Sequence, residues 1–268
     1  MRIAVWKTGH AIADQVADYV ARSLEKSGQE VSIQRTSKVG DVAAFDMHIA
    51  YGILRGTTDV FRECTKAGLP WFHIDRGYFH PGHFDGQYRI SLCGTQHVYD
   101  LNNFTAEYPE VSNVIRIPSQ EDYHLIVPPS DAVCEFFGID RKCWILSKSS
   151  RHSVVRNKDC TTPLKDHLKG CSKLVTFNST SAIQALKLGI QVESDPEHSI
   201  IGAFQKTLDF PIHTDKESIR KLFGIMSNLQ MTLSDMSNGK LWPLMKRLTC
   251  LSDTTAENLS LPMSQPIA

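Results

Sequence analysis

The segment that decides the fold is residues 173–192, KLVTFNSTSAIQALKLGIQV. It begins with the apolar stretch Lys173–Phe177, passes through the polar run Asn178–Ser181, and continues with apolar residues at helical spacing over Ala182–Leu188. Gly189 then stops the helix, and a second short apolar stretch follows it. Apolar runs that alternate with helical patterns indicate a parallel β-sheet covered by helices. The segment therefore predicts a strand–turn–helix unit of an α/β protein.

The Asn178–Ser181 turn has the chemistry of an anion site. The first turn of a helix presents backbone N–H groups without intrahelical partners, and the helix dipole adds positive potential there. The hydroxyls of Ser179, Thr180 and Ser181 supply further donors, so we predict that the turn binds a phosphate. Plain N-capping by Ser179 or Ser181, which needs no ligand, is the alternative. The turn lacks the glycines and the lysine of a P-loop, which argues against ATP hydrolysis.

The rest of the chain repeats the alternation of strands and helices. Predicted strands are Arg2–Trp6, Glu30–Arg35, Phe45–Tyr51, Trp71–Ile74, Gln87–Leu92, His124–Val127, Trp144–Ser147, Ser153–Asn157 and Ile190–Glu193; predicted helices include Ala11–Ser27, Asp59–Ala67, Ser130–Phe137, Pro163–Gly170 and several after Asp215. We expect two Rossmann-like lobes, residues 1–122 and 123–250. The second lobe would include the terminal helices, and the Ser-, Thr- and Pro-containing tail 251–268 would be flexible.

Composition narrows the class of protein. Lysine plus arginine and aspartate plus glutamate each number 29, so the formal net charge is zero. Proteins that coat nucleic acid without sequence preference usually carry a basic excess. The seven cysteines are scattered and form no C-x-x-C pair, which suits reduced thiols in a cytoplasmic protein. The sequence contains no run of about eighteen apolar residues, so we expect no membrane span.

The fold-deciding segment also resembles a known family. In bacterial capsule-polysaccharide-synthesis and Kdo-type glycosyltransferases, and in their uncharacterised phage and bacterial relatives, an apolar strand leads into an Asn-Ser-Thr or Ser-Ser-Thr turn. Their helix then ends in Ala-Leu-x-x-Gly-x-Pro-Val. This chain reads ALKLGIQV over residues 185–192, with Gln191 in place of the proline. The resemblance extends over Tyr123–Asp195. Arg156-Asn157-Lys158 takes the place of the family's Lys-x-His-Pro element.

The resemblance implies a two-lobed, GT-B-like glycosyltransferase. The C-terminal lobe would hold a nucleotide sugar as co-substrate, with no cofactor and no metal, because basic side chains would neutralise the departing phosphate. The donor-binding residues would be Arg151, Arg156, Lys158, Asn178, Ser179, Thr180, Ser181 and Glu193. Among these, Glu193 would accept hydrogen bonds from the ribose hydroxyls. The alternatives are a solvated charged turn for Arg156 and Lys158, and an exposed strand-end carboxylate for Glu193.

The N-terminal lobe would bind the acceptor and supply the base. In open parallel sheets, ligands bind beyond the carboxyl ends of the strands. Three predicted strand ends carry suitable side chains, and Asp75 is our choice of base because it closes a strand. The expected catalytic residues are Asp75, Arg76 and His10, and the expected acceptor-binding residues are Gly9, Arg55, Gly77, Tyr78 and Phe79. Tyr78 and Phe79 would stack on a sugar or base ring. The alternative for Asp75 is a buried residue that caps the next turn.

The sequence also bears on metal binding, on the acceptor and on the alternative functions. His80 and His83 flank Pro81-Gly82, which excludes the helical spacing of a metal-ligand pair.

The acceptor is either a modified base in phage DNA, which implies the host cytoplasm, or a bacterial surface polysaccharide. Functions of another class are a non-catalytic nucleotide- or sugar-binding module and a nucleotide-sugar epimerase-like enzyme.

Overall fold

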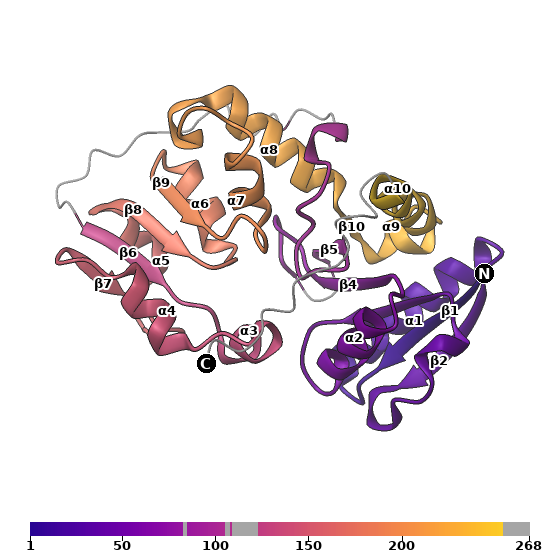
Figure 1. Cartoon of the computed structure of the whole chain (residues 1–268). Coiled ribbons are helices and arrows are strands. Elements are labelled where there is room, and N and C mark those ends of the chain that lie inside the picture. The colour runs from indigo at the N-terminus through magenta and orange to yellow at the C-terminus, as the bar shows by residue number, and fades with distance from the viewer. Residues whose placement is uncertain (83–84, 105–107, 109–122, 254–268) are drawn as a thin grey trace. The chain divides into compact units, whose positions relative to one another are not determined.

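The computed structural model describes residues 1–82, 85–104, 108 and 123–253. These residues form two compact units, each built on its own sheet (Figure 1). The first unit comprises Met1–Asp100 and the described residues from Ser227 onward, and the second comprises the described residues of Leu101–Met226. The prediction of an α/β fold with two Rossmann-like lobes is confirmed. The predicted boundary at residue 122 and the tail residues 254–268 lie outside the described residues.

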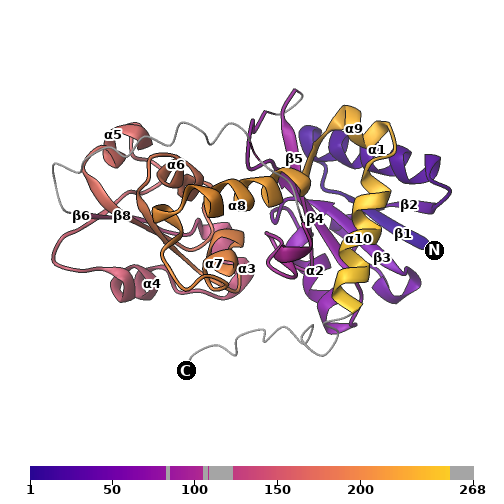
Figure 2. The ribbon, with the colours of Figure 1, turned by 90° about the horizontal axis from the view of Figure 1, so that it is seen from above.

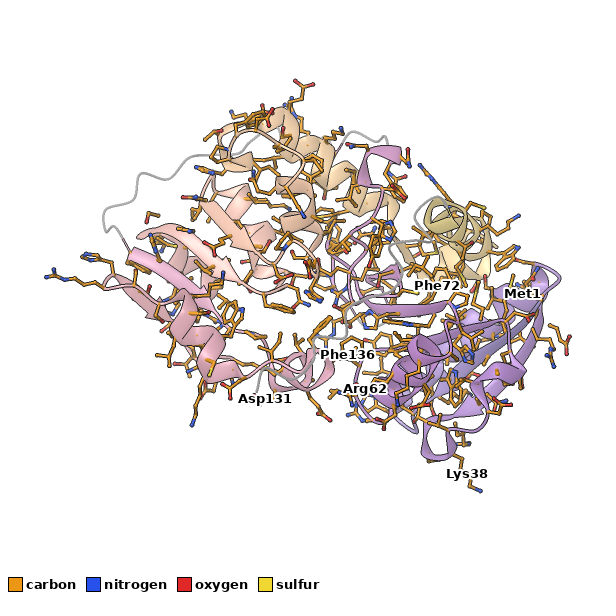
Figure 3. The ribbon with its side chains drawn as sticks, viewed as in Figure 1. Met1, Lys38, Arg62, Phe72, Asp131 and Phe136 are labelled. Carbon is orange, nitrogen blue, oxygen red and sulfur yellow. The ribbon has the colours of Figure 1, made fainter. Side chains whose placement is uncertain are left out.

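The first unit contains a six-stranded sheet in the order β10-β5-β4-β3-β1-β2. Its strands are β1 (Arg2–Lys7), β2 (Glu30–Arg35), β3 (Met47–Tyr51), β4 (Trp71–Arg76), β5 (Gln87–Leu92) and β10 (Gln230–Thr232), and its first helices are α1 (Ala11–Lys26) and α2 (Thr57–Lys66). The first four strands are parallel, whereas β5 and β10 run antiparallel to their neighbours. Phe72 on β4 is fully buried in this unit, whereas Lys38 projects from its surface (Figure 3).

The C-terminal helices belong to the first unit, which corrects their predicted place in the second lobe. Helix α9 (Leu233–Ser237) begins with a capping box formed by Thr232 and Asp235. Helices α9 and α10 (Leu241–Asp253) both pack against α1 (Figure 2). The buried Ser23 hydroxyl on α1 donates to the carbonyl of Met236. Because α10 extends to Asp253, the first three residues of the predicted tail are helical.

The second unit contains a four-stranded, fully parallel sheet in the order β7-β6-β8-β9. Its strands are β6 (Tyr123–Val127), β7 (Ser153–Val155), β8 (Cys171–Thr176) and β9 (Gln191–Ser194). Its helices are α3 (Asp131–Phe137), α4 (Arg141–Lys148), α5 (Leu164–Leu168), α6 (Ser181–Lys187) and α7 (Ile200–Gln205), and α8 (Lys216–Asn228) leads out of it. Strand β8, the polar turn and α6 reproduce the predicted strand–turn–helix unit.

Trp144–Ser147 is not the predicted strand but part of α4. The Asp140 carboxylate caps this helix by accepting a hydrogen bond from the backbone N–H of Cys143 at 2.7 Å. The apolar run that suggested a strand is not buried, and Leu146 is 73% exposed. A short apolar run cannot by itself separate a strand from a helix, and here the local cap selects the helix.

The two sheets share one strand order. Within each unit the parallel strands are arranged second, first, third, fourth, as β2-β1-β3-β4 and as β7-β6-β8-β9. In this order the chain leaves the first and third strands in opposite directions, which opens a crevice beyond their carboxyl ends. Ligand sites are therefore expected beyond β1 and β3 in the first unit and beyond β6 and β8 in the second. Among the described helices, none combines the length and hydropathy needed to cross a bilayer.

Candidate functional site

The Asn178–Ser181 turn lies at the crevice position of the second sheet, directly after β8. The Ser179 Oγ atom accepts hydrogen bonds from the backbone N–H of Ser181 at 3.2 Å and from its hydroxyl at 2.9 Å. Ser179 therefore has the capping role that we weighed as an alternative, and Ser181 is buried against it. Thr180 is exposed and its side chain forms no capping hydrogen bond. Thr180 is thus the hydroxyl of this turn best placed to meet a ligand.

In the first sheet, the turn after β1 is already occupied by a carboxylate. The Asp14 Oδ1 atom, in the first turn of α1, accepts hydrogen bonds from the backbone N–H groups of Thr8 at 2.8 Å and Gly9 at 3.1 Å. A phosphate bound there would have to displace this internal anion. The counterpart of β8 in that sheet is β3, and helix α2 after it carries Asp59 in its first turn. The first turn of α6 carries no acidic residue. This contrast favours the second sheet as the phosphate-binding one.

A histidine–aspartate pair lies beside the Asn178–Ser181 turn. In the loop after β9, Asp195 Oδ1 accepts hydrogen bonds from His198 Nδ1 at 2.8 Å and from the backbone N–H groups of Glu197 and His198. The Phe177 ring stacks on the His198 ring with centroids 5.1 Å apart, and the Asp195 N–H donates to the Phe177 carbonyl. Since Asn178 follows Phe177, the pair adjoins the polar turn. Neither residue is among those predicted from the sequence, although the Asp-x-x-His spacing of Asp195 and His198 after a strand is a usable signal.

The electrostatics of this pair orient the histidine ring. Burial alone would raise the pKa of Asp195, but the hydrogen bonds from His198 and from two backbone N–H groups outweigh it and lower that pKa. Asp195 is therefore an anion at neutral pH and acts as the acceptor for Nδ1. The other ring nitrogen of His198, Nε2, is then the one available to a ligand. This is the arrangement in which a carboxylate fixes a histidine for hydrogen bonding or proton transfer.

The predicted basic residues are not all brought together. Arg156 directly follows β7 at the carboxyl edge of the sheet, where its Nη2 atom donates to the Thr162 carbonyl at 3.1 Å. Its buried Nε atom has no hydrogen-bond partner among the described residues. Lys158 is exposed in the same loop. Arg151 precedes β7, and because parallel strands all begin at one edge, it lies at the edge away from the turn.

A second arginine, Arg141, lies near the carboxyl ends of β6 and β7 and was not predicted from the sequence. Arg141 donates to the Asp131 carboxylate at 3.1 Å and to the Asn157 side chain at 3.2 Å. It therefore ties the first turn of α3, which follows β6, to the loop that follows β7. Arg141, Arg156 and Lys158 all contribute positive charge near these strand ends, and Arg141 is ion-paired with Asp131.

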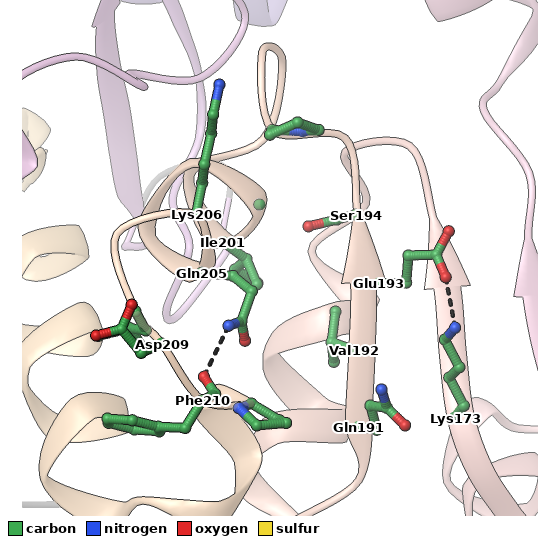
Figure 4. Close-up of a pocket in the computed structure, with 14 residues that line it drawn as sticks. Lys173, Gln191, Val192, Glu193, Ser194, Ile201, Gln205, Lys206, Asp209 and Phe210 are labelled. Atoms are coloured by element: carbon green, nitrogen blue, oxygen red, sulfur yellow. Dashed lines mark hydrogen bonds and ion pairs between the residues drawn. The ribbon is translucent and has the colours of Figure 1, made fainter.

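Glu193 forms two ion pairs on the second sheet. Its carboxylate oxygens lie 2.8 Å from Lys148 Nζ and 2.5 Å from Lys173 Nζ. Burial raises the pKa of this carboxyl, but the two ammonium groups outweigh burial and lower it. Glu193 lines a cavity of about 630 Å³ between β9 and the segment formed by α7 and Leu208–Pro211 (Figure 4). The predicted contact of Glu193 with ribose hydroxyls stays a prediction.

Three strand ends of the first unit meet at one edge, as predicted. Neighbouring strands β1, β3 and β4 are parallel, so the residues that follow them share the carboxyl edge of the sheet. His10 is the N-cap residue of α1, and Arg55 lies in the turn after β3 with φ of 59°. Asp75 and Arg76 close β4. The backbone thus brings His10, Gly9, Arg55 and the Asp75–Arg76 pair to one edge.

Asp75 is paired with an arginine that the sequence analysis did not single out. Arg89 on β5 stands opposite Asp75, and its Nη2 atom lies 2.7 Å from Asp75 Oδ2. The other guanidinium nitrogens of Arg89 donate to the carbonyls of Arg76 and Thr95. Burial raises the pKa of Asp75, but Arg89 and the other neighbouring donors outweigh it and lower that pKa. Asp75 is therefore ionised at neutral pH and has a reduced affinity for a proton.

Gly77, Tyr78 and Phe79 are core residues rather than an acceptor-binding surface. A Cβ atom on Gly77 would lie 2.8 Å from the Gln87 carbonyl oxygen and from Gln230 Oε1, so the glycine is required by close packing. Tyr78 and Phe79 are only 6% and 5% exposed. Burial raises the pKa of Tyr78 to about 12. The predicted stacking of these rings on a ligand is therefore corrected: their faces are covered by the protein.

The described residues contain no group of three or more metal-ligating side chains. His80 is exposed, and His83 lies outside the described residues. The prediction that the reaction needs no metal stays a prediction.

Comparison with known proteins gives matches in structure but not in sequence. No protein-family model matches the chain, and no curated protein matches its sequence. Thermosulfurimonas dismutans KpsC, a beta Kdo 2,4 transferase, is similar at 11% identity over 72% of this chain and 79% of that one, with a TM-score of 0.39. With a TM-score below 0.5, this similarity assigns no activity to the chain.

Two other solved structures are similar over more of the chain. UDP-GlcNAc 2-epimerase from Methanocaldococcus jannaschii has 10% identity over 92% of this chain and 100% of that one, with a TM-score of 0.30. The glycosyltransferase SsfS6 from Streptomyces sp. SF2575, complexed with thymidine diphosphate, has 11% identity over 91% of this chain and 99% of that one, with a TM-score of 0.28. Neither similarity identifies the ligand of this protein.

Proposed function

We propose that this protein is a metal-independent glycosyltransferase that moves a sugar from a nucleotide sugar to an acceptor hydroxyl. The second unit would bind the nucleotide sugar, and the first unit would bind the acceptor. The observation that carries the proposal is the Asn178–Ser181 turn at the crevice of a parallel sheet, with His198 held beside it by Asp195. The resemblance of residues 173–192 to the nucleotide-binding half of capsule and Kdo-type transferases supplies the reaction class.

The donor phosphates would lie against the turn. The Thr180 hydroxyl and the backbone N–H groups at the start of α6 would donate to phosphate oxygens. Arg156 has a buried Nε atom without a described partner, so a phosphate would satisfy a donor that the protein leaves unpaired. In its doubly protonated form, with Nδ1–H held by Asp195, His198 would donate from Nε2 to the same group. These donors would stabilise the negative charge that develops on the departing diphosphate or phosphate.

The transfer itself needs a base for the acceptor hydroxyl. The acceptor oxygen would form a bond to the anomeric carbon while the bond from that carbon to the phosphate oxygen breaks. The hydroxyl proton would pass to Asp75, which is ionised at neutral pH. Its Oδ2 atom is held by Arg89, and its Oδ1 atom accepts from the backbone N–H of Arg76 at 2.8 Å, leaving lone-pair capacity on Oδ1.

The donor half of the proposal is tested by a thermal-shift screen of UDP-, GDP-, CMP- and dTDP-sugars. A ligand that binds the native state should raise the melting temperature, and the increase should grow with the logarithm of the ligand concentration once that concentration exceeds the Kd. The hit is then repeated with Thr180→Ala and with the control Ser149→Ala, which removes a hydroxyl that lies before β7, at the edge away from the turn, and donates to the Ile145 carbonyl. If Thr180→Ala reduces the shift and Ser149→Ala leaves it unchanged, the turn is supported as the donor site. No shift with any nucleotide sugar would contradict it.

The acceptor half is tested by transfer. The bound nucleotide sugar, radiolabelled in the sugar, is incubated with DNA containing hydroxymethylated bases and, separately, with capsular oligosaccharides. We propose these two acceptor classes because each offers a hydroxyl, and the neutral net charge mildly favours the glycan. Label that enters either acceptor supports transfer and names the acceptor class.

One observation favours a second candidate, a non-catalytic nucleotide-binding module. The proposed base, Asp75, is engaged by Arg89 and its pKa is lowered, which weakens it as a proton acceptor. Such a module would bind the nucleotide sugar at the same turn but would neither transfer nor hydrolyse it. Nucleotide release by the wild-type protein in the presence of acceptor decides against the module.

A further inference from the structure

A cysteine and a histidine are hydrogen-bonded in the second unit, apart from the turn and from His198. The Cys160 Sγ atom lies 3.4 Å from His167 Nε2. Cys160 belongs to the loop between β7 and α5, and its backbone N–H closes a turn on the Asn157 carbonyl at 3.2 Å. His167 lies on α5, and its carbonyl accepts a hydrogen bond from the Tyr123 hydroxyl. Both members of the pair are therefore held by contacts of their own.

The other thiols have different surroundings. Burial raises the pKa of Cys64 to about 12 and that of Cys93 to about 11. Cys143 is exposed, but the hydrogen bond to the Asp140 carboxylate raises its pKa. Cys250 is also exposed. In the part of the chain that the structure describes, Cys160 alone among the thiols has an imidazole nitrogen as its hydrogen-bond partner.

We propose that Cys160 and His167 form a thiol–imidazole pair that makes Cys160 a site of covalent modification by small, soft carbon electrophiles. The thiolate is the nucleophilic form of cysteine, and an adjacent imidazole favours it by taking the thiol proton. Sulfur then forms a bond to the electrophilic carbon, the leaving group departs with its electron pair, and the proton stays on His167. The adduct lies in the loop that also carries Arg156 and Lys158.

The Cys160–His167 pair and solvent exposure predict different orders of thiol reactivity. Cys160 is half-buried, whereas Cys143 and Cys250 are exposed, so accessibility alone ranks the exposed thiols as more reactive. A thiolate-stabilising partner ranks Cys160 first.

The experiment labels the native full-length protein with limiting iodoacetamide at pH 7 and quantifies each cysteine-containing peptide by mass spectrometry. We expect Cys160 to be carbamidomethylated first, roughly tenfold faster than Cys250. In His167→Asn, the Cys160 rate should fall to that of Cys250, while the Cys250 rate stays unchanged. Labelling of Cys160 no faster than Cys250 in the wild type, or an unchanged Cys160 rate in His167→Asn, overturns the proposal.

A second measurement on the wild type keeps the test decisive if His167→Asn does not fold. The labelling is repeated in a concentration of urea that unfolds the chain, where the preference for Cys160 should disappear because the pair is broken. A preference that persists in urea would show that local sequence, not the pairing with His167, sets the reactivity, and it would overturn the proposal.

Discussion

The Nδ1 atom of His198 lies 2.8 Å from Oδ1 of Asp195, and the imidazole of His198 stacks on the ring of Phe177. The same Asp195 oxygen also accepts hydrogen bonds from two backbone N–H groups. The backbone therefore holds the carboxylate in position, and the carboxylate in turn orients the imidazole. Phe177 is the residue that leads into the polar turn. Two loops that follow neighbouring parallel strands are therefore joined into one polar site, in which His198 Nε2 has no hydrogen-bond partner among the described residues.

Replacing His198 with Gln should reduce sugar transfer. The variant keeps a polar side chain but loses the ring that donates to the departing phosphate, and loss of a positioned acid–base group typically reduces rates by about 10²–10⁴-fold. We expect kcat to fall by at least about 100-fold while donor affinity changes much less. Steady-state kinetics measure both, and Glu197→Gln is the matched control because the Glu197 backbone, not its side chain, binds Asp195. Wild-type kcat in His198→Gln would exclude this histidine from the reaction.

Replacing Thr180 with Ala should weaken donor binding without destabilising the fold. Its side chain forms no capping hydrogen bond, so its loss should be felt only by the ligand. A hydrogen bond to a charged phosphate contributes about 1.5–3 kcal/mol, which corresponds to a loss of affinity of roughly tenfold or more. Ser179→Ala, by contrast, should also lower the free energy of unfolding by about 1 kcal/mol because Ser179 caps α6. Calorimetric titration and urea unfolding separate the two effects, and equal affinity of wild type and Thr180→Ala would remove the turn from the donor site.

Arg156→Gln and Arg151→Gln should differ although the residues are close in sequence. Arg156 lies at the carboxyl edge of the second sheet, and Arg151 lies before β7 at the other edge. Removal of one charge-assisted contact to phosphate should weaken nucleotide binding roughly tenfold in Arg156→Gln. Arg151→Gln should bind as the wild type does. Calorimetric titration at one fixed salt concentration measures the nucleotide affinity of both variants. If Arg151→Gln loses more affinity than Arg156→Gln, the nucleotide sugar binds at the amino edge of the sheet.

Asp75→Asn should remove turnover and also lower stability at neutral pH. The variant leaves the guanidinium of Arg89, which is only 12% exposed on its side chain, without its carboxylate. A largely buried donor that loses its partner costs about 1–3 kcal/mol. Because the folded-state pKa of Asp75 is lowered, its stabilising effect is present above the unfolded pKa of about 3.9 and is lost as the pH falls through the folded pKa.

The free energies of unfolding of wild type and Asp75→Asn should therefore converge as the pH falls below about 4. Urea unfolding at a series of pH values measures this convergence. Donor binding should persist in the variant at pH 7. A constant stability difference across the pH range would mean that the Asp75–Arg89 ion pair contributes nothing, and wild-type turnover would eliminate Asp75 as the base.

Gly77→Ala should destabilise the first unit. A methyl group there meets the Gln87 backbone carbonyl at 2.8 Å, and backbone cannot give way as a flexible side chain can. Overpacking of this kind typically costs about 1–3 kcal/mol. Gly40→Ala is the matched control, since a Cβ at Gly40 meets nothing within 4 Å. Thermal unfolding compares the two variants, and equal melting temperatures would show that Gly77 is not held by close packing.

Local patterns in the sequence determined most of the regular structure. The strand–turn–helix unit around Asn178–Ser181, helix α3 and the whole of strand β5 are confirmed within a residue or two. These features depend on periodicity, capping and turn chemistry within about ten neighbouring residues, which a sequence displays directly. The α/β class, with two sheets that each contain four parallel strands, follows from the same alternation.

Tertiary structure alone decided the remaining features, because they depend on partners far away in the chain. Gln230–Thr232 lies in a helical pattern but forms β10, since β5 offers a pairing edge about 140 residues away. The sequence predicts Asp75 as a base without a partner, but strand pairing with β5 places Arg89 opposite it. Tyr78 and Phe79 looked like ligand-stacking rings but fill the core.

The functional site shows the same division. The sequence by itself determined the polar turn, because the hydroxyls and the helix start are local. Only the fold could bring Asp195 and His198 beside that turn, since they follow the neighbouring strand and meet Phe177 through sheet pairing. Side chains on separate strands become one site when hydrogen bonding sets the strand order, and strand order is a non-local property of the chain.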